Sequence, residues 1–91
     1  MCTISWGSTQ RRLRLSGPCE ARDRDAVRDA LASCEGGGRV LIVDMTAVTS
    51  LAPAVAEVVL AARDRGEGCR VNVLRRKGTA VEQVLAAAES R

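Results

Sequence analysis

The sequence predicts an α/β fold, with a mostly parallel four-stranded sheet and about three helices in the order β-β-α-β-α-β-α. Segments with apolar residues at helical spacing alternate with short runs rich in β-branched residues. Glycines and prolines separate these segments. The 91 residues are 46% hydrophobic and include one aromatic residue. We therefore expect a single domain over residues 1–91, with a dense aliphatic core.

The N-terminal region predicts two short strands. Residues 3–6 could begin an edge strand, and residues 12–15 alternate polar and apolar side chains so that both leucines share one face. Residues 7–10 have the composition of a turn, which would allow the two segments to form a hairpin. Gly17 and Pro18 follow, and we expect them to close the second strand.

A helix and a buried strand are expected next. Residues 22–34 carry an apolar stripe opposite a charged face. The glycines at 36–38 would end this helix as a flexible connector, since phosphate-binding loops instead follow a strand and open a helix. Residues 40–43, Val-Leu-Ile-Val before Asp44, predict a central parallel strand that is buried on both faces by helices above or below it.

Residues 45–52 would connect this strand to Pro53, whose fixed φ suits the first turn of a helix. We expect that helix to run to about Arg65, with its apolar stripe at Val55, Val58, Val59 and Ala62. Ala56 and Leu60 widen the stripe, which indicates either deeper burial or a docking face. Residues 69–74 predict a further strand. Gly78 and Thr79 open a last helix, whose apolar side chains are Val81, Val84, Leu85 and Ala88.

Composition argues against several classes of function. The net charge is +3, and the basic clusters at residues 11–14 and 75–77 have no interleaved aromatic residue for base stacking, so we expect no nucleic-acid partner. The chain has no histidine, and Asp23, Asp25 and Asp29 would lie on a solvated helical face, so we expect no enzyme activity.

Metal, cofactor and membrane binding are not expected either. The four cysteines are too widely separated for a CxxC pair, and we interpret them as reduced residues of the core or surface. One aromatic residue gives little material for a cofactor pocket. No apolar run has the length of a signal peptide or a membrane span, so we expect a cytoplasmic protein.

The segment from Val40 to Leu51, followed by the Pro53 helix and Gly66, resembles the STAS domain family, whose members include the bacterial anti-sigma factor antagonists. Residues 13–17 look like the second strand of that family, and residues 69–74 look like a later strand. The resemblance spans roughly residues 11 to 88. It implies a STAS-like domain that binds a protein partner, such as a kinase-type anti-sigma factor.

The sequence departs from the family at the start of this helix. In the family, an Asp-Ser-Ser-Gly-like sequence opens the helix and supplies a hydroxyl that accepts phosphate. Here Ala54 falls at the acceptor position, while Ala52 and Val55 replace the Asp and the Gly. The resemblance therefore implies a module that has lost control by phosphorylation, because Ala54 has no nucleophilic oxygen.

We expect the partner to dock on the start of this helix. The predicted binding residues are Ser50, Leu51, Ala52, Pro53, Ala54 and Glu57. Glu57 would either contact a basic patch on the partner or stabilise the positive end of the helix dipole. Two alternatives are open: a scaffold subunit that packs on another protein or on itself, as a homodimer would, and a small-ligand sensor for which the sequence indicates no polar pocket.

Overall fold

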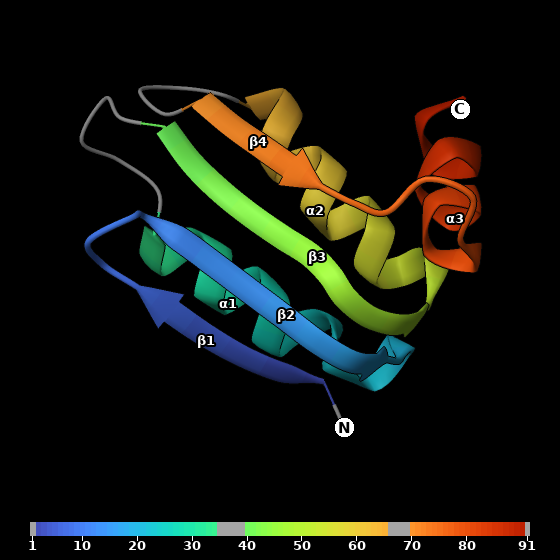
Figure 1. Cartoon of the computed structure of the whole chain (residues 1–91), viewed down its shortest axis with the longest axis horizontal. Coiled ribbons are helices and arrows are strands. Elements are labelled where there is room, and N and C mark those ends of the chain that lie inside the picture. The colour runs from blue at the N-terminus through green and yellow to red at the C-terminus, as the bar shows by residue number, and fades with distance from the viewer. Residues whose placement is uncertain (1, 35–39, 66–69, 91) are drawn as a thin grey trace.

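The computed structural model describes residues 2–34, 40–65 and 70–90. It contains the predicted elements in the predicted order (Figure 1). A 3-10 turn at Ala21–Asp23 precedes the first α-helix. The strands and helices are β1 (Thr3–Gly7), β2 (Arg12–Cys19), α1 (Arg24–Cys34), β3 (Val40–Leu51), α2 (Pro53–Arg65), β4 (Arg70–Leu74) and α3 (Ala80–Glu89).

The four strands form one mixed sheet in the order β1-β2-β3-β4. β1 and β2 are antiparallel and form the expected hairpin, while β2, β3 and β4 are mutually parallel neighbours. Leu13 of β2 is registered with Val43 of β3, which pairs in turn with Val73 of β4. These rows place the aliphatic side chains of adjacent strands on the same face of the sheet.

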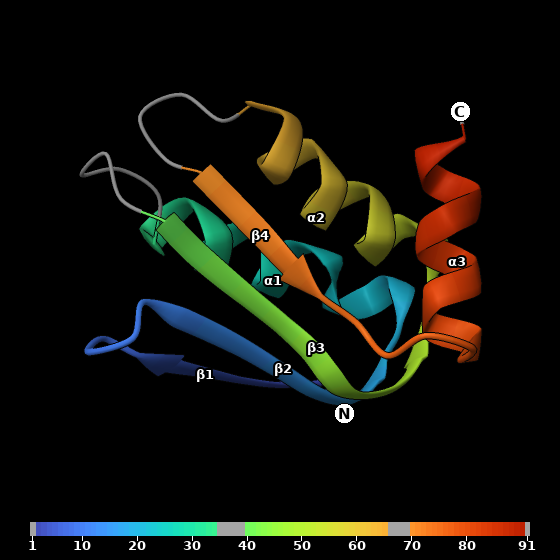
Figure 2. The same ribbon diagram turned by 45° about the horizontal axis from the view of Figure 1, so that its top comes forward.

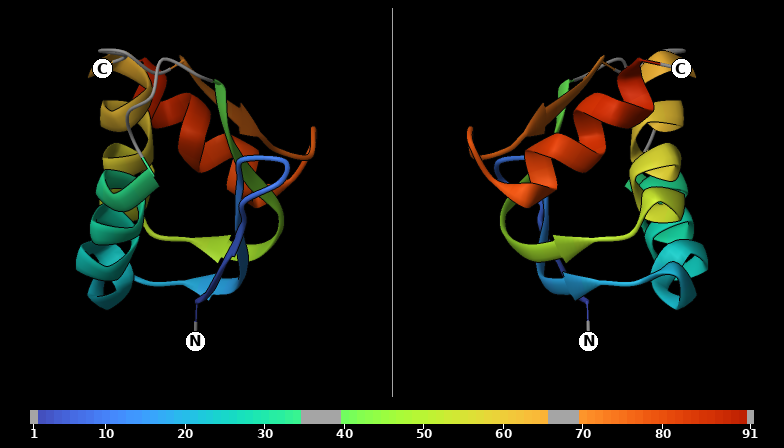
Figure 3. Two further views of the ribbon diagram at one scale, coloured as in Figure 1. Left: turned by 90° about the vertical axis from the view of Figure 1, so that its left-hand side faces the viewer. Right: turned by 90° about the vertical axis from the view of Figure 1, so that its right-hand side faces the viewer.

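The helices cover one face of this sheet. α1 and α2 lie side by side along it, and α3 packs beside α2 and against the far part of β3 (Figures 2 and 3). The core lies between the two layers. Its largest fully buried side chains are Leu13, Leu15, Cys19, Val27, Leu31, Leu41, Val43, Met45, Val55, Val59 and Leu85.

The prediction that residues 40–43 are buried on both faces is wrong. Leu41 and Val43 point into the core and are 0% exposed, whereas Val40 is 43% exposed and Ile42 is half-buried. The reason is the single helical layer. Alternate side chains of β3 point to the opposite face, which no described element covers (Figure 3).

Two strand boundaries also differ from expectation. β3 does not end at Asp44, and residues 45–51 extend it as a strand where a connection was predicted. β2 does not close at Gly17 and Pro18 but runs to Cys19, so that Cys19 pairs with Leu51. Register shifts accompany this extension, and Gly17 adopts a φ of 78°, which glycine tolerates best. Long-range pairing thus overrides the local turn signals.

The helices agree better with their sequence pattern. α1 starts two residues later than predicted, because residues 21–23 form the 3-10 turn, and α2 spans Pro53–Arg65 as expected. Ala56 and Leu60 are 0% and 5% exposed, so the widened stripe of α2 reflects deep burial and the docking-face alternative is wrong. The predicted features at residues 36–38, Gly66 and Cys69 lie outside the described residues.

Candidate functional site

The predicted binding residues lie at the junction between β3 and α2. Backbone hydrogen bonds hold this junction: Ala52 N donates to Cys19 O over 2.8 Å, and Ala52 O accepts from Val55 N and Ala56 N. Ala52 stands where helix caps usually have a side-chain oxygen, and its methyl group offers none. The helix therefore starts from the pairing of β3 with β2 and from the fixed φ of Pro53.

Most of the predicted residues are accessible at this junction. Ser50, Pro53 and Glu57 are exposed, and Ala52 and Ala54 are half-buried. Leu51 is only 7% exposed and belongs to the core, so its prediction as a partner-contacting side chain is wrong. Leu51 is buried at the end of β3, where it pairs with the buried Cys19. Residues 45–51 had not been expected to join this strand.

The first turn of α2 contains no acidic residue, and Glu57 lies in the second turn, where the dipole effect is weaker. Its position does suit a surface role, because it follows Pro53 by four residues and Ala54 by three. Side chains at these spacings share one side of a helix.

A shallow hollow of about 300 Å³ adjoins Pro53 at the start of α2. Its other lining residues come from α3: Ala80, Gln83, Val84 and Ala87. These residues were not predicted as part of a site, because the sequence pattern of α3 indicates only an inward apolar stripe. The sequence feature that could have indicated this hollow is the run of three alanines at residues 86–88, whose small side chains leave room on the outer side of α3.

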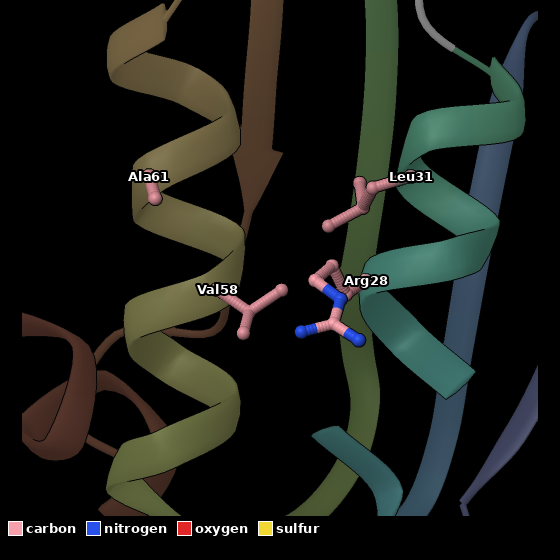
Figure 4. Close-up of a pocket in the computed structure, with 4 residues that line it drawn as sticks. All are labelled: Arg28, Leu31, Val58 and Ala61. Carbon is pink, nitrogen blue, oxygen red and sulfur yellow. The ribbon is translucent and has the colours of Figure 1, made fainter. Parts of the chain in front are cut away.

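A second, smaller cleft of about 110 Å³ lies between α1 and α2 (Figure 4). Leu31 and Val58 point toward one another across it, and the guanidinium of Arg28 lies over the gap at one end. Leu31 is 1% exposed, so this side chain is already part of the core. The cleft is a seam between two packed helices.

Asp44 is the one buried charged residue among those the structure describes, at 7% exposure. Thr46 donates to its Oδ1 through both the backbone N–H and the hydroxyl, and Arg12 Nη1 lies 3.7 Å from its Oδ2. Burial by itself would raise the pKa of Asp44. The hydrogen bonds from Thr46 and the charges of Arg12 and Arg14 outweigh burial and hold that pKa below its ordinary value.

Cys2 and Cys19 are buried free thiols, as expected for small core residues. Burial and a hydrogen bond with Cys2 raise the pKa of Cys19 to about 12. A thiol with such a pKa stays protonated and is a poor nucleophile or metal ligand. Within residues 2–34, 40–65 and 70–90, no group of His, Cys, Asp and Glu could hold a metal ion, and no helix has the length and apolarity to cross a membrane.

Comparisons with known proteins establish the fold and nothing further. No protein-family model matches the chain, and no curated protein is significantly similar to it. Its structure is similar to the crystal structure of a protein called Mglu, with a TM-score of 0.63 and 20% sequence identity. The similarity covers 85% of this chain but 20% of the Mglu chain. The same fold therefore forms part of a much longer polypeptide there.

Proposed function

We propose that this chain is a STAS-like, non-catalytic protein-binding module of the anti-sigma factor antagonist type. It acts in the cytoplasm and lacks control by phosphorylation. Its partner is a protein, of which a kinase-type anti-sigma factor is the first candidate. The element order, the mixed four-stranded sheet and the helical start at Pro53 are compatible with the family that the sequence resembles.

The observation that carries this proposal is the surface around the start of α2. Exposed Pro53 and half-buried Ala54 lie beside the hollow formed with α3, and exposed Glu57 lies one turn away. Small apolar side chains beside a carboxylate suit a complementary protein surface with apolar and basic groups. The hollow is open and carries no acid, base or nucleophile, which favours docking over chemistry.

Two alternatives stay open. One is a scaffold role, in which this domain packs on another protein or on a second copy. The small-ligand alternative is favoured by a polar hollow at the other end of the sheet, lined by Arg12 and Arg14.

The direct test is capture of partners from a lysate of the source organism, followed by mass spectrometry. Recovery of a kinase-type anti-sigma protein supports the proposal, whereas recovery of this chain alone supports a self-associating scaffold. The recovered kinase-type protein should transfer no phosphate from ATP to this chain. Phosphate found on Thr46, Thr49 or Ser50 would contradict the loss of phosphorylation control.

A charge at the junction tests the docking surface itself. Ala54→Asp places a carboxylate at the second residue of α2, where the helix dipole tolerates it, and should weaken the complex. Ala61→Asp is the matched control, because Ala61 is exposed on the same helix two turns further on. If Ala54→Asp stays folded and binds with unchanged affinity, the partner does not dock at this junction.

A further inference from the structure

The face of the sheet opposite the helices carries a cluster of arginines. Arg12 and Arg14 are two residues apart on β2, and they alternate with Leu13 and Leu15, which are buried against the helices. Register with β1 places Gly7 opposite Arg12 and Ser5 opposite Arg14. The pairing forms a hollow of about 260 Å³ lined by Ser5, Trp6, Gly7, Gln10, Arg12 and Arg14.

The guanidinium groups in this hollow have spare hydrogen-bonding capacity. Arg14 makes no hydrogen bond or ion pair with any residue that the structure describes. The Nε of Arg12 is buried and has no hydrogen-bond partner among the residues that the structure describes. The ion pair of Arg12 with Asp44 is long, because Nη1 lies 3.7 Å from Oδ2. Oδ1 of Asp44 is already occupied by Thr46. The exposed guanidinium of Arg14 therefore has donors that an acceptor from solvent can reach.

The charges on this face favour an anion. Among the described strand residues that point to the open face, the basic ones are Arg12, Arg14 and Arg70, and the acidic one is Asp44. Asp44 is 7% exposed, so it projects little negative charge into solvent. The guanidinium group presents several N–H donors in a plane, which matches the oxygens of a phosphate group better than an ammonium would.

We propose that this hollow binds the phosphate group of a small ligand, with Arg12 and Arg14 as the anion-binding residues. The hydroxyl of Ser5 and the amide of Gln10 are exposed polar groups at its rim. Trp6 borders the hollow between Ser5 and Gly7, but it is registered with Leu13, so its side chain belongs to the opposite face of the sheet.

The size of the hollow favours a small molecule over a nucleic-acid strand. Drug-sized ligands occupy sites of roughly 300–1,000 Å³, and this hollow is smaller. Proteins that bind single-stranded nucleic acid without sequence preference stack successive bases on aromatic side chains, and this chain has one aromatic residue. Residues on both sides of the β1–β2 turn line the hollow. This turn lies at the opposite end of the sheet from the β3–α2 junction, so the two proposed sites can be tested separately (Figure 1).

The direct test measures binding to the full chain by isothermal titration calorimetry. The chain is titrated with inorganic phosphate, with AMP and with a single-stranded oligonucleotide, at constant ionic strength adjusted with chloride. We expect saturable changes with phosphate and AMP, and tighter binding of AMP. No saturable change with either, or an oligonucleotide that binds more tightly than AMP, would overturn the small-ligand assignment.

Paired variants assign the binding to the hollow. Arg14→Gln should weaken AMP binding by about tenfold or more, because a hydrogen bond to a charged group is lost. Arg76→Gln removes the same charge beyond the opposite end of β4, and should change the affinity by less than about twofold. Thermal melts check that both variants stay folded. Equal effects of the two variants would mean general charge attraction and would overturn the proposed site.

Discussion

The hydroxyl of Thr46 donates a 2.6 Å hydrogen bond to Oδ1 of Asp44, and the Thr46 backbone N–H donates a second of 3.0 Å to the same atom. This pairing lies in the middle of β3, on the side where no helix covers the sheet. It holds a nearly buried carboxylate in its ionised form. A strand that would otherwise lose stability from a buried charge is thereby stabilised.

Removal of the hydroxyl should destabilise the domain. Thr46→Val keeps the β-branched shape but loses one bond to a charged acceptor, for which we expect a loss of about 1.5–3 kcal/mol of unfolding free energy. Thr49→Val, at an exposed position of the same strand, should change it by less than about 0.5 kcal/mol. Urea denaturation measures both values. Equal midpoints for the two variants would mean that the Asp44 contact contributes nothing to stability.

The effect of Thr46→Val should depend on pH. The pKa of Asp44 is lowered in the folded state, so its stabilising effect is complete above the ordinary value of 3.8 and is lost as the pH falls through the folded-state pKa. The difference in unfolding free energy between wild type and Thr46→Val should be constant from pH 7 to about pH 5 and shrink below pH 3.8. If this difference in unfolding free energy grew toward low pH, the pKa of Asp44 would not be lowered in the folded state.

Two neighbouring residues of β3 should respond differently to truncation. Leu41→Ala should cost about 2–5 kcal/mol, because its side chain is 0% exposed under the helices. Ile42→Ala should cost only about 1 kcal/mol, because Ile42 is half-buried on the open face. Chemical denaturation of both variants tests which face holds the core. A larger loss for Ile42→Ala would mean that something covers the open face in solution.

The N-terminus of α3 depends on Thr79. Its Oγ1 accepts a 3.2 Å hydrogen bond from Glu82 N and donates one of 2.7 Å to Arg76 O. Thr79→Ala should cost about 1 kcal/mol, while Thr79→Ser, which keeps the oxygen, should cost a few tenths at most. Thermal melts compare the two variants. Equal stability of both would show that the oxygen does not cap the helix.

The candidate sites differ in how far local sequence could reveal them. Pro53, Ala54 and Glu57 are close in the chain, so their shared surface follows from helical spacing alone. The contributions of Ala80 and Val84 depend on how α3 packs beside α2, which no local pattern encodes. The arginine hollow was missed for a similar reason. Arg12 and Arg14 were recognised as basic residues, but only the pairing with β1 brings Ser5 and Gly7 beside them.

The order of elements, the α2 boundaries and the inward stripes of the helices could be predicted from the sequence. These depend on side-chain periodicity and on local signals such as Pro53 and Thr79. Three features depend on contacts between distant segments and could not be predicted: β2 runs through Gly17 and Pro18, residues 45–51 extend β3, and one face of the sheet is open. Strand length and burial depend on hydrogen-bonding partners and covering layers distant in the chain. Four apolar residues in a row do not reveal how many helical layers cover them.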